Sequence, residues 1–264
     1  MSMGRRLEDQ VAIVTGAASG IGLGIVERFA EERAKVAMVD LNENLGREAV
    51  KTFRLKGLAC EFFPADVAKE EDVIHLMEKI SGLYGGIDHL VNNAGVVLVK
   101  PIEEQTVDEW DRVMDVNVKS IFLTTKHSLP WLKKSSRSTI VNIGSVSSFV
   151  GQKWTPSYVA SKGAVLMLSK SLALDLAQYQ IRVNCVCPGI TDTPMLRFHL
   201  ESSPNPEEAL LKRLDRVPLE RLLQPEDIAR AVLYLSSHES GGITGTSLIV
   251  DGGYLTTAEW SNRL

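Results

Sequence analysis

Short runs of β-branched and aliphatic residues alternate with longer, helix-periodic segments along almost the whole chain of 264 residues. Strands that alternate with helices predict βαβ units, in which a parallel sheet is covered by helices on both faces. The runs rarely alternate apolar with polar residues, as expected for strands buried on both sides. The seven predicted strands are Val11–Thr15, Lys35–Asp40, Cys60–Ala65, Ile87–Asn92, Thr139–Ile143, Arg182–Cys187 and Ser247–Val250.

We predict that residues 1–264 form a single doubly wound α/β domain, because a chain of this length can bury one large core and shows no linker or repeat. Ligands of such sheets bind at the carboxyl ends of the strands. Two segments break the alternation. Residues 190–217 contain Pro194, Pro204 and Pro206, Pro218 follows directly, and helical periodicity is weak. This pattern predicts a long ordered loop that serves as a substrate lid. The tail, residues 254–264, follows the last strand and carries Trp260.

A glycine-rich segment, TGAASGIG at residues 15–22, joins the first predicted strand to the first helix. Glycine is needed where the chain turns sharply, where backbone approaches a pyrophosphate and where a helix meets a strand closely. Gly16, Gly20 and Gly22 are placed for these three tasks. The helix that begins near Ile21 directs free N–H groups and its positive end toward the phosphates. The segment therefore predicts a dinucleotide site.

Asp40 closes the second predicted strand and indicates which dinucleotide binds. Its carboxylate can accept hydrogen bonds from both hydroxyls of the adenosine ribose, but it would repel the 2′-phosphate of NADP. Neither Leu41 nor Asn42 supplies a compensating cation. The sequence therefore favours NAD over NADP. The alternative, that Asp40 merely ends a strand, is weak after this glycine loop.

The spacing of these glycines differs from the commonest dinucleotide pattern and resembles that of the short-chain dehydrogenase/reductase family. Further matches follow in family order and extend the resemblance from Val11 to Gly253. They are Asp66-Val67, Asn92-Asn93-Ala94-Gly95, Asn117, Ser145, the pair Tyr158 and Lys162, and Pro188-Gly189. The resemblance implies a single-domain Rossmann fold and an oxidoreductase that uses a nicotinamide cofactor.

The resemblance also implies a set of cofactor contacts. Asp66 and Val67 would hold the adenine ring, and the segment from Pro188 would face the nicotinamide. The complete predicted set is Gly16, Ser19, Gly20, Ile21, Gly22, Asp40, Leu41, Asp66, Val67, Asn93, Ala94, Gly95, Tyr158, Lys162, Pro188, Gly189, Ile190 and Thr193. For Asn92, Asn93 and Gly95, stabilisation of a tight turn is an equally good interpretation, and the two roles can coexist.

Tyr158 and Lys162 are four residues apart in a helix-periodic segment that runs to about Gln178, so their side chains share one helix face. Tyrosine titrates near ~10 and is a poor base at neutral pH. A neighbouring ammonium group and an oxidised nicotinamide both favour the phenolate. We therefore predict that Tyr158 is the acid/base, and that Lys162 also binds the nicotinamide ribose.

Ser145 and Asn117 complete the predicted catalytic group. The Ser145 hydroxyl, at the end of a strand, can hydrogen-bond the substrate oxygen. The resemblance implies that Asn117 helps to relay the proton to solvent. A lone Tyr…Lys pair is most often an ordinary surface feature, but the pair occurs here with the other family motifs.

The predicted substrate pocket involves Ser145, Gln152, Trp154 and Tyr158. Further walls are expected from Val96-Val97, Ser147 and the lid residues Met195, Leu196 and His199. A carboxamide beside an aromatic side chain suits a polyhydroxylated or cyclic substrate. His75, His89 and His127 are expected to be non-catalytic, and His199 to be a solvated loop residue.

The sequence predicts an NAD-dependent oxidoreductase that moves a hydride between the nicotinamide and a secondary alcohol or ketone, with a sugar, polyol or cyclic alcohol as substrate. A 3-oxoacyl-[acyl-carrier-protein] reductase is the main alternative, since the sequence resembles those enzymes almost as well. Asp40 argues against it, because reductive biosynthesis usually draws on NADPH. A non-enzymatic NAD-binding sensor or scaffold is the third possibility, and the intact catalytic group argues against it.

Charge and composition limit the partners. A formal net charge of −4 offers no electrostatic footprint for nucleic acid or an anionic membrane. No apolar stretch is long enough to span a bilayer, and the basic N-terminus is not followed by a signal-peptide core. Cys60, Cys185 and Cys187 are expected to be buried, reduced thiols with no metal site. These features predict a cytoplasmic enzyme that binds a small-molecule substrate and no metal.

The expected assembly is a homotetramer, as the resemblance implies. The apolar content of residues 121–132 and 165–176 is compatible with helix packing between subunits, and Trp260 would reach a neighbouring subunit.

Overall fold

A computed structural model describes residues 5–257. Its core is a sheet of seven parallel strands in the order β3-β2-β1-β4-β5-β6-β7. This confirms the predicted sheet, and the predicted strand bounds differ from the observed ones by one or two residues at a few ends. The strands are β1 (Val11–Thr15), β2 (Lys35–Asp40), β3 (Cys60–Pro64), β4 (His89–Asn92), β5 (Thr139–Ile143), β6 (Arg182–Pro188) and β7 (Ser247–Val250).

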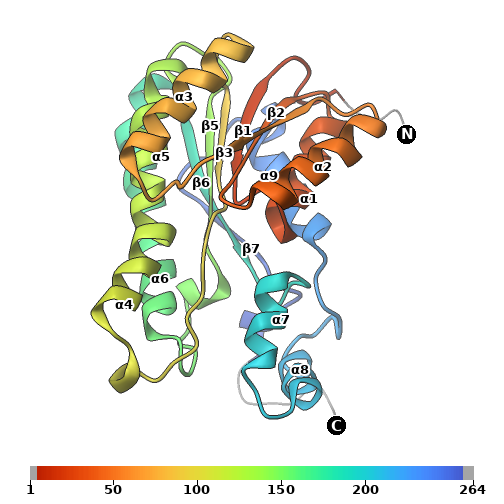
Figure 1. The fold of residues 1–264 in the computed structure, drawn as a ribbon, viewed down its shortest axis with the longest axis vertical. Helices are drawn as coiled ribbons and strands as arrows, with labels where there is room; N and C mark the ends of the chain where they lie inside the picture. The colour runs from red at the N-terminus through yellow and green to blue at the C-terminus, as the bar shows by residue number, and fades with distance from the viewer. Residues whose placement is uncertain (1–4, 258–264) are drawn as a thin grey trace.

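Helices cover both faces of the sheet and extend beyond one end of it (Figure 1). The helices are α1 (Gly20–Glu31), α2 (Glu43–Leu55), α3 (Glu70–Tyr84), α4 (Val107–Met114), α5 (Ser120–Leu132), α6 (Pro156–Leu176), α7 (Pro194–Glu201), α8 (Pro206–Leu214) and α9 (Pro225–Ser236). In Figure 1, α1, α2 and α9 lie on one side of the strands, and α3, α5 and α6 lie on the other. The short helices α4, α7 and α8 lie beyond the carboxyl ends of the strands.

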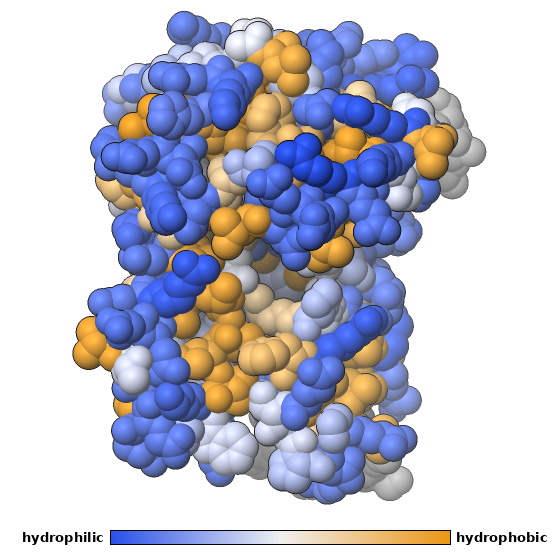
Figure 2. Space-filling model, viewed as in Figure 1, coloured by the Kyte–Doolittle hydropathy of each residue, from blue (hydrophilic) through white to orange (hydrophobic). Residues whose placement is uncertain are grey.

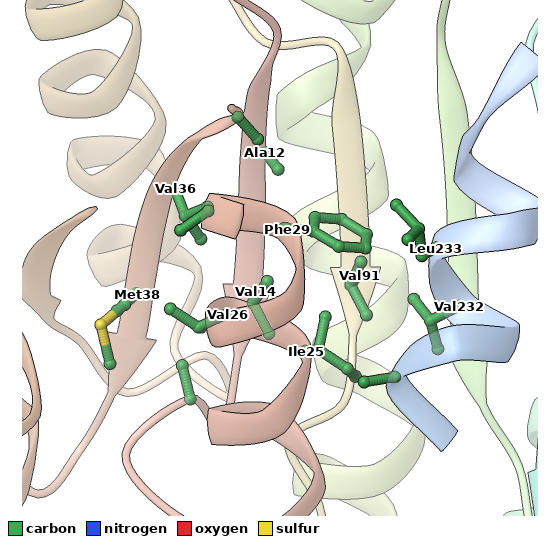
Figure 3. Close-up of a cluster of buried hydrophobic side chains, with 14 of the residues drawn as sticks. Ala12, Val14, Ile25, Val26, Phe29, Val36, Met38, Val91, Val232 and Leu233 are labelled. Carbon is green, nitrogen blue, oxygen red and sulfur yellow. The ribbon is translucent and has the colours of Figure 1, made fainter. Parts of the chain in front are cut away.

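Each face of the sheet carries its own hydrophobic core. On the first face, α1 places Ile25, Val26 and Phe29 against the strands and α9 (Figure 3). Phe29 is fully buried, and the strand β1 beneath it is buried along its whole length. Strands with both faces covered carry no polar alternation, which explains why the predicted runs were almost continuously apolar.

The sheet order reverses direction between β1 and β4, which are neighbours although two strands lie between them in sequence. The connections leaving β1 and β4 therefore run to opposite sides, and a crevice opens between them at the carboxyl ends of the strands. This crevice positions the site described below.

Residues 190–217 were predicted as a long loop, and that prediction was wrong. The structure places two helices there, α7 and α8. Thr193 and Asn205 cap their N-termini with side-chain oxygens that accept backbone N–H groups, and a proline follows each cap at the first helical position. Proline at that position starts a helix rather than breaking one, because its missing N–H is not needed there.

After β7 the chain turns through a short 3₁₀ helix, Tyr254–Thr256. Trp260, which was expected to reach a neighbouring subunit, lies outside the described residues. No helix in residues 5–257 is long and apolar enough to cross a membrane.

Candidate active site

A cavity of about 450 Å³ opens at the carboxyl ends of the strands. Its lining extends from the glycine loop after β1, past the ends of β4 and β5, to α7 and α8. In the space-filling view (Figure 2), this side of the molecule is hollowed at mid-height, and hydrophobic side chains gather in and below the hollow. The cavity has two ends, the glycine-loop end after β1 and the end that contains Tyr158.

The glycine loop forms a cradle that larger residues could not form. Gly16 has a φ of +62°, which strains residues with a side chain. A Cβ atom at Gly22 would lie 2.1 Å from the carbonyl oxygen of Gly16. Because the loop packs this closely and leads into the N-terminus of α1, it fits the pyrophosphate of a dinucleotide.

The turn after β4 is fixed to this cradle. The Thr15 hydroxyl accepts the N–H groups of Asn93 and Ala94, both at 3.0 Å. The Asn93 amide donates to the carbonyls of Thr15 and Gly16 at 2.9 and 3.0 Å. Asn93 therefore has a structural role while it also lines the cavity.

Asn92 faces the other way and lies inside the protein. Its side-chain Nδ2 donates to Asn142 Oδ1 at 2.8 Å, and its side-chain Oδ1 accepts a hydrogen bond from the Thr124 hydroxyl at 2.7 Å. Asn92 is buried and does not line the cavity, so its role is structural.

Asp40 lines the cavity beside the cradle. One carboxylate oxygen accepts the N–H of Ala18 at 3.0 Å, and the other accepts the N–H of Asn42 at 2.9 Å. These bonds hold the carboxylate in place at the end of β2. Carboxylate oxygens have further lone pairs, so Asp40 can still accept hydroxyl groups from a ribose.

Tyr158, on the first turn of α6, lines the opposite end of the cavity. Burial raises the pKa of its phenol, and a hydrogen bond with the Ser145 hydroxyl opposes that rise. Ser145 precedes a short 3₁₀ turn, and its Oγ accepts the N–H of Ser147 at 3.0 Å. In the chain alone, burial outweighs the predicted lowering of the pKa, so the phenol is neutral near pH 7.

Lys162 lies one turn after Tyr158 on α6, as the spacing predicts. Its Nζ is 5.7 Å from the centre of the Tyr158 ring and donates to the carbonyl of Ile143 at 2.8 Å. Burial lowers the pKa of Lys162 to about 8. The ammonium group is 5% exposed, and it lines the cavity beside Gly95.

Asn117 lies in a π-helical turn, Asp115–Lys119, between α4 and α5. Its Oδ1 accepts the N–H of Val96 at 2.8 Å, and its Nδ2 donates to the Val96 carbonyl at 3.0 Å and to Ser161 Oγ at 2.9 Å. Asn117 is 1% exposed and does not line the cavity. These bonds tie the segment after β4 to α6, and the part of Asn117 in a proton relay stays a prediction.

Beyond Tyr158, a chain of hydrogen bonds joins the turn after Ser145 to α7. The Ser147 hydroxyl donates to Gln152 Oε1 at 3.1 Å, and Gln152 Nε2 lies 3.3 Å from Nδ1 of His199. His199 was expected to touch substrate or, with more weight, to be a solvated loop residue, and the second expectation was wrong. It lies on α7, half-buried, and lines the cavity.

Trp154, predicted to wall the substrate pocket, does not line the cavity. Its φ is +63° and its side chain is 52% exposed. The indole instead lies against the Lys153 ammonium, 4.7 Å from the ring centre. Trp154 is therefore a surface residue outside the cavity, and its proximity in sequence to Tyr158 misled the prediction.

Comparison with known proteins agrees with this geometry. A family model described as enoyl-(acyl carrier protein) reductase matches residues 16–255. The chain belongs to the short-chain dehydrogenase/reductase family. Among curated relatives in this family, a cyclopentanol dehydrogenase of Comamonas sp. is 39% identical over 94% of this chain and 98% of its own length.

Two other similar proteins are named for different substrates. An NADP-dependent (R)-specific alcohol dehydrogenase of Lentilactobacillus kefiri is 36% identical over 94% of this chain and 98% of its own length. The solved structure of the aldohexose dehydrogenase of Thermoplasma acidophilum superposes with a TM-score of 0.87, at 37% identity and 98% coverage of both chains. The chain is therefore an oxidoreductase of a family that acts on alcohols and sugars with a nicotinamide cofactor.

The cavity of this short-chain dehydrogenase/reductase brings together almost all the predicted cofactor residues. Gly22 is the exception, because it packs behind Gly16 instead of lining the cavity. Sequence reasoning missed several lining residues, for which no motif gave a signal: Val39, Ala65, Arg112, Val116, Thr191 and Arg213. Within residues 5–257, no three His, Cys, Asp or Glu side chains are grouped to hold a metal ion.

Proposed function

We propose that this protein is an NAD-dependent dehydrogenase of secondary alcohols, with Tyr158 as the acid/base. The observation that supports this most directly is the arrangement of Ser145, Tyr158 and Lys162 around one end of a cavity whose other end is the glycine cradle with Asp40. When bound, the cofactor accepts or donates the hydride. The protein supplies position and proton handling.

In the oxidation direction, Tyr158 takes the proton of the substrate hydroxyl as its hydride leaves. The Ser145 hydroxyl, which hydrogen-bonds the Tyr158 phenol in the chain alone, can donate to the substrate oxygen as charge develops on it. In the reduction direction, Tyr158 returns the proton to the same oxygen. The roles of both side chains follow from their shared position at the cavity wall.

Lys162 supports the phenolate form of Tyr158. Burial keeps the phenol neutral in the chain alone, so the positive charges of Lys162 and of an oxidised nicotinamide are both needed to lower its pKa. Lys162 also has donors to spare for the nicotinamide ribose, because its bond to Ile143 uses one of three. Tyr158 then becomes a competent base only when the cofactor is in place.

The preference for NAD rests on Asp40. Its carboxylate is fixed by two backbone N–H groups at the end of β2, where a 2′-phosphate would meet a negative charge. Leu41, which follows it and lines the cavity, offers no cation. The relative from Lentilactobacillus kefiri is NADP-dependent, so family membership alone does not select the cofactor, and the proposal rests on Asp40.

For the substrate we propose a sugar, polyol or cyclic alcohol. The similarity to a cyclopentanol dehydrogenase and an aldohexose dehydrogenase supports this class. The amide of Gln152, in the cavity near Tyr158, can bind a second hydroxyl.

We also propose a cytoplasmic homotetramer. Phe122 on α5 and Met167 and Leu174 on α6 are large apolar side chains that are 53%, 61% and 81% exposed in the single chain. Packing of these two helices against another subunit would cover them. Light scattering of the purified protein tests the assembly.

The function is tested by following NADH formation at 340 nm with NAD and a panel of sugars, polyols and cyclic secondary alcohols. NADP replaces NAD in a parallel series, and an acetoacetyl thioester with NADH is run in the opposite direction. We expect turnover of an alcohol with NAD. Preferential reduction of the thioester would favour the 3-oxoacyl reductase alternative, and activity with NADP alone would contradict the role of Asp40.

A further inference from the structure

The lid formed by α7 and α8 presents cationic and hydrogen-bond-donating groups to the cavity. His199 on α7 and Arg213 on α8 both line it. The acidic lining residues among those described are Asp40 and Asp66, and both lie at the glycine-loop end of the cavity. The Tyr158 end therefore has an excess of positive charge, although the chain as a whole has a net charge of −4.

Arg213 is half-buried, and burial lowers the pKa of its guanidinium. One nitrogen donates to the carbonyl of Ala209 on the preceding turn, at 2.9 Å. None of the ion pairs among the described residues involves Arg213, whereas its neighbour Lys212 pairs with Glu208. A guanidinium carries five donors in a planar fork, and among residues 5–257 the bond to Ala209 is the one hydrogen bond that the Arg213 side chain donates. Such a fork matches a carboxylate, sulfonate or phosphate.

His199 and Gln152 add neutral donors beside Arg213. The Ser147 hydroxyl occupies Gln152 Oε1, so the Gln152 amide group faces His199 as a donor. One ring nitrogen of His199 therefore accepts, and the other carries the proton. Burial and the nearby charge of Arg213 lower the pKa of His199, which keeps the ring neutral near pH 7. Its remaining N–H can donate to an oxygen in the cavity.

We propose that the substrate carries an oxyanion in addition to the reacting hydroxyl, and that Arg213, assisted by His199, binds that oxyanion from the lid. The proposal rests on the proposed function and narrows it to alcohols or ketones with an acidic substituent. Binding of the anion fixes α7 and α8 against the substrate. The reacting carbon is then held at Tyr158 by groups on both walls of the cavity.

The test uses four substrates with one carbon skeleton: 3-hydroxybutyrate, 3-hydroxybutane-1-sulfonate, 3-hydroxybutyl phosphate and the neutral 3-hydroxybutanamide. For each, kcat and KM are measured with NAD, and Kd is measured by calorimetry on the enzyme saturated with NADH. The proteins are the wild type, Arg213→Gln, Arg213→Lys and the control Lys212→Gln. Lys212 lies next to Arg213 on α8 with its side chain 74% exposed, so the control removes the same charge outside the cavity.

We expect the wild type to prefer at least one anion to the amide by tenfold or more in kcat/KM, mainly through KM. A charge-assisted hydrogen bond from a guanidinium is worth roughly 10- to 100-fold in affinity. In Arg213→Gln, kcat/KM for the preferred anion should fall by tenfold or more, and kcat/KM for the amide should change by less than twofold. Arg213→Lys should retain part of the preference for the anion, and Lys212→Gln should match the wild type. The preferred anion identifies the acidic group.

Equal binding of the amide and all three anions, in the wild type and in Arg213→Gln, would overturn the proposal whatever the turnover. Oxidation of neutral alcohols would still leave the proposed function in place. If no compound is oxidised but anions bind with a Kd that depends on Arg213, the oxyanion site stands and the proposed function fails.

Discussion

Replacement of Lys162 by methionine should stabilise the chain without cofactor while it destroys the catalytic site. Burial lowers the pKa of Lys162 from 10.5 to about 8. At about 1.4 kcal/mol for each tenfold change in the acid constant, folding the charged side chain costs about 3 kcal/mol. Loss of the bond to the Ile143 carbonyl offsets about 1–2 kcal/mol of this. A net gain of about 1–2 kcal/mol raises the melting temperature by roughly 3–6 °C.

The stability gained by Lys162→Met should fall as the pH rises. Between pH 8 and 10.5 the unfolded lysine holds a proton that the folded one has released, so wild-type stability rises with pH through that window. The advantage of Lys162→Met should therefore be full at pH 7 and largely lost by pH 10. Melting curves of both proteins without cofactor measure it, with Lys170→Met as a control, since Lys170 is exposed on the same helix. A variant less stable than wild type at pH 7, or a difference independent of pH, would refute the reasoning.

Three further changes test other parts of the account. Gly22→Ala puts a Cβ 2.1 Å from a backbone carbonyl oxygen, so the Kd for NADH should rise at least tenfold when it is measured by fluorescence. The control Gly82→Ala has open space around its Cβ and should leave the Kd unchanged. Burial lowers the pKa of His89 to about 4, so acidification from pH 6.5 to 4 should cost about 2–3 kcal/mol of stability in urea titrations. His89→Gln should flatten that slope, and an unchanged slope would assign it to other groups. Gln152→Ala should raise KM several-fold, while Trp154→Ala should leave kcat and KM within twofold; the reverse result would restore Trp154 to the pocket wall.

The sheet and the cofactor end were predictable because their signals are local. A buried parallel strand is a continuous apolar run, which stands out in the sequence. The glycines of the cradle and Asp40 stand directly at strand ends, so sequence order placed them at one edge of the sheet. Gly22 shows the limit, because no sequence pattern separates a glycine that touches the cofactor from one that lets the loop close.

The substrate end was harder to predict because it is assembled from distant segments. The segment that contains Pro194 and Pro206 was predicted as a long loop, although each proline follows a capping residue and begins a helix. This error hid the helical positions of His199 and Arg213. Trp154 adopts a positive φ that no sequence rule assigns to a tryptophan.

The most direct test of the central claim is the oxidation of the best secondary alcohol with NAD by wild type and Tyr158→Phe, together with the Kd of each for NADH. Tyr158→Phe keeps the ring and removes the proton-transfer group. The account predicts that turnover falls at least a hundredfold, as expected for loss of a general acid/base, while the Kd for NADH stays within a few-fold. Unchanged turnover in Tyr158→Phe would contradict the mechanism.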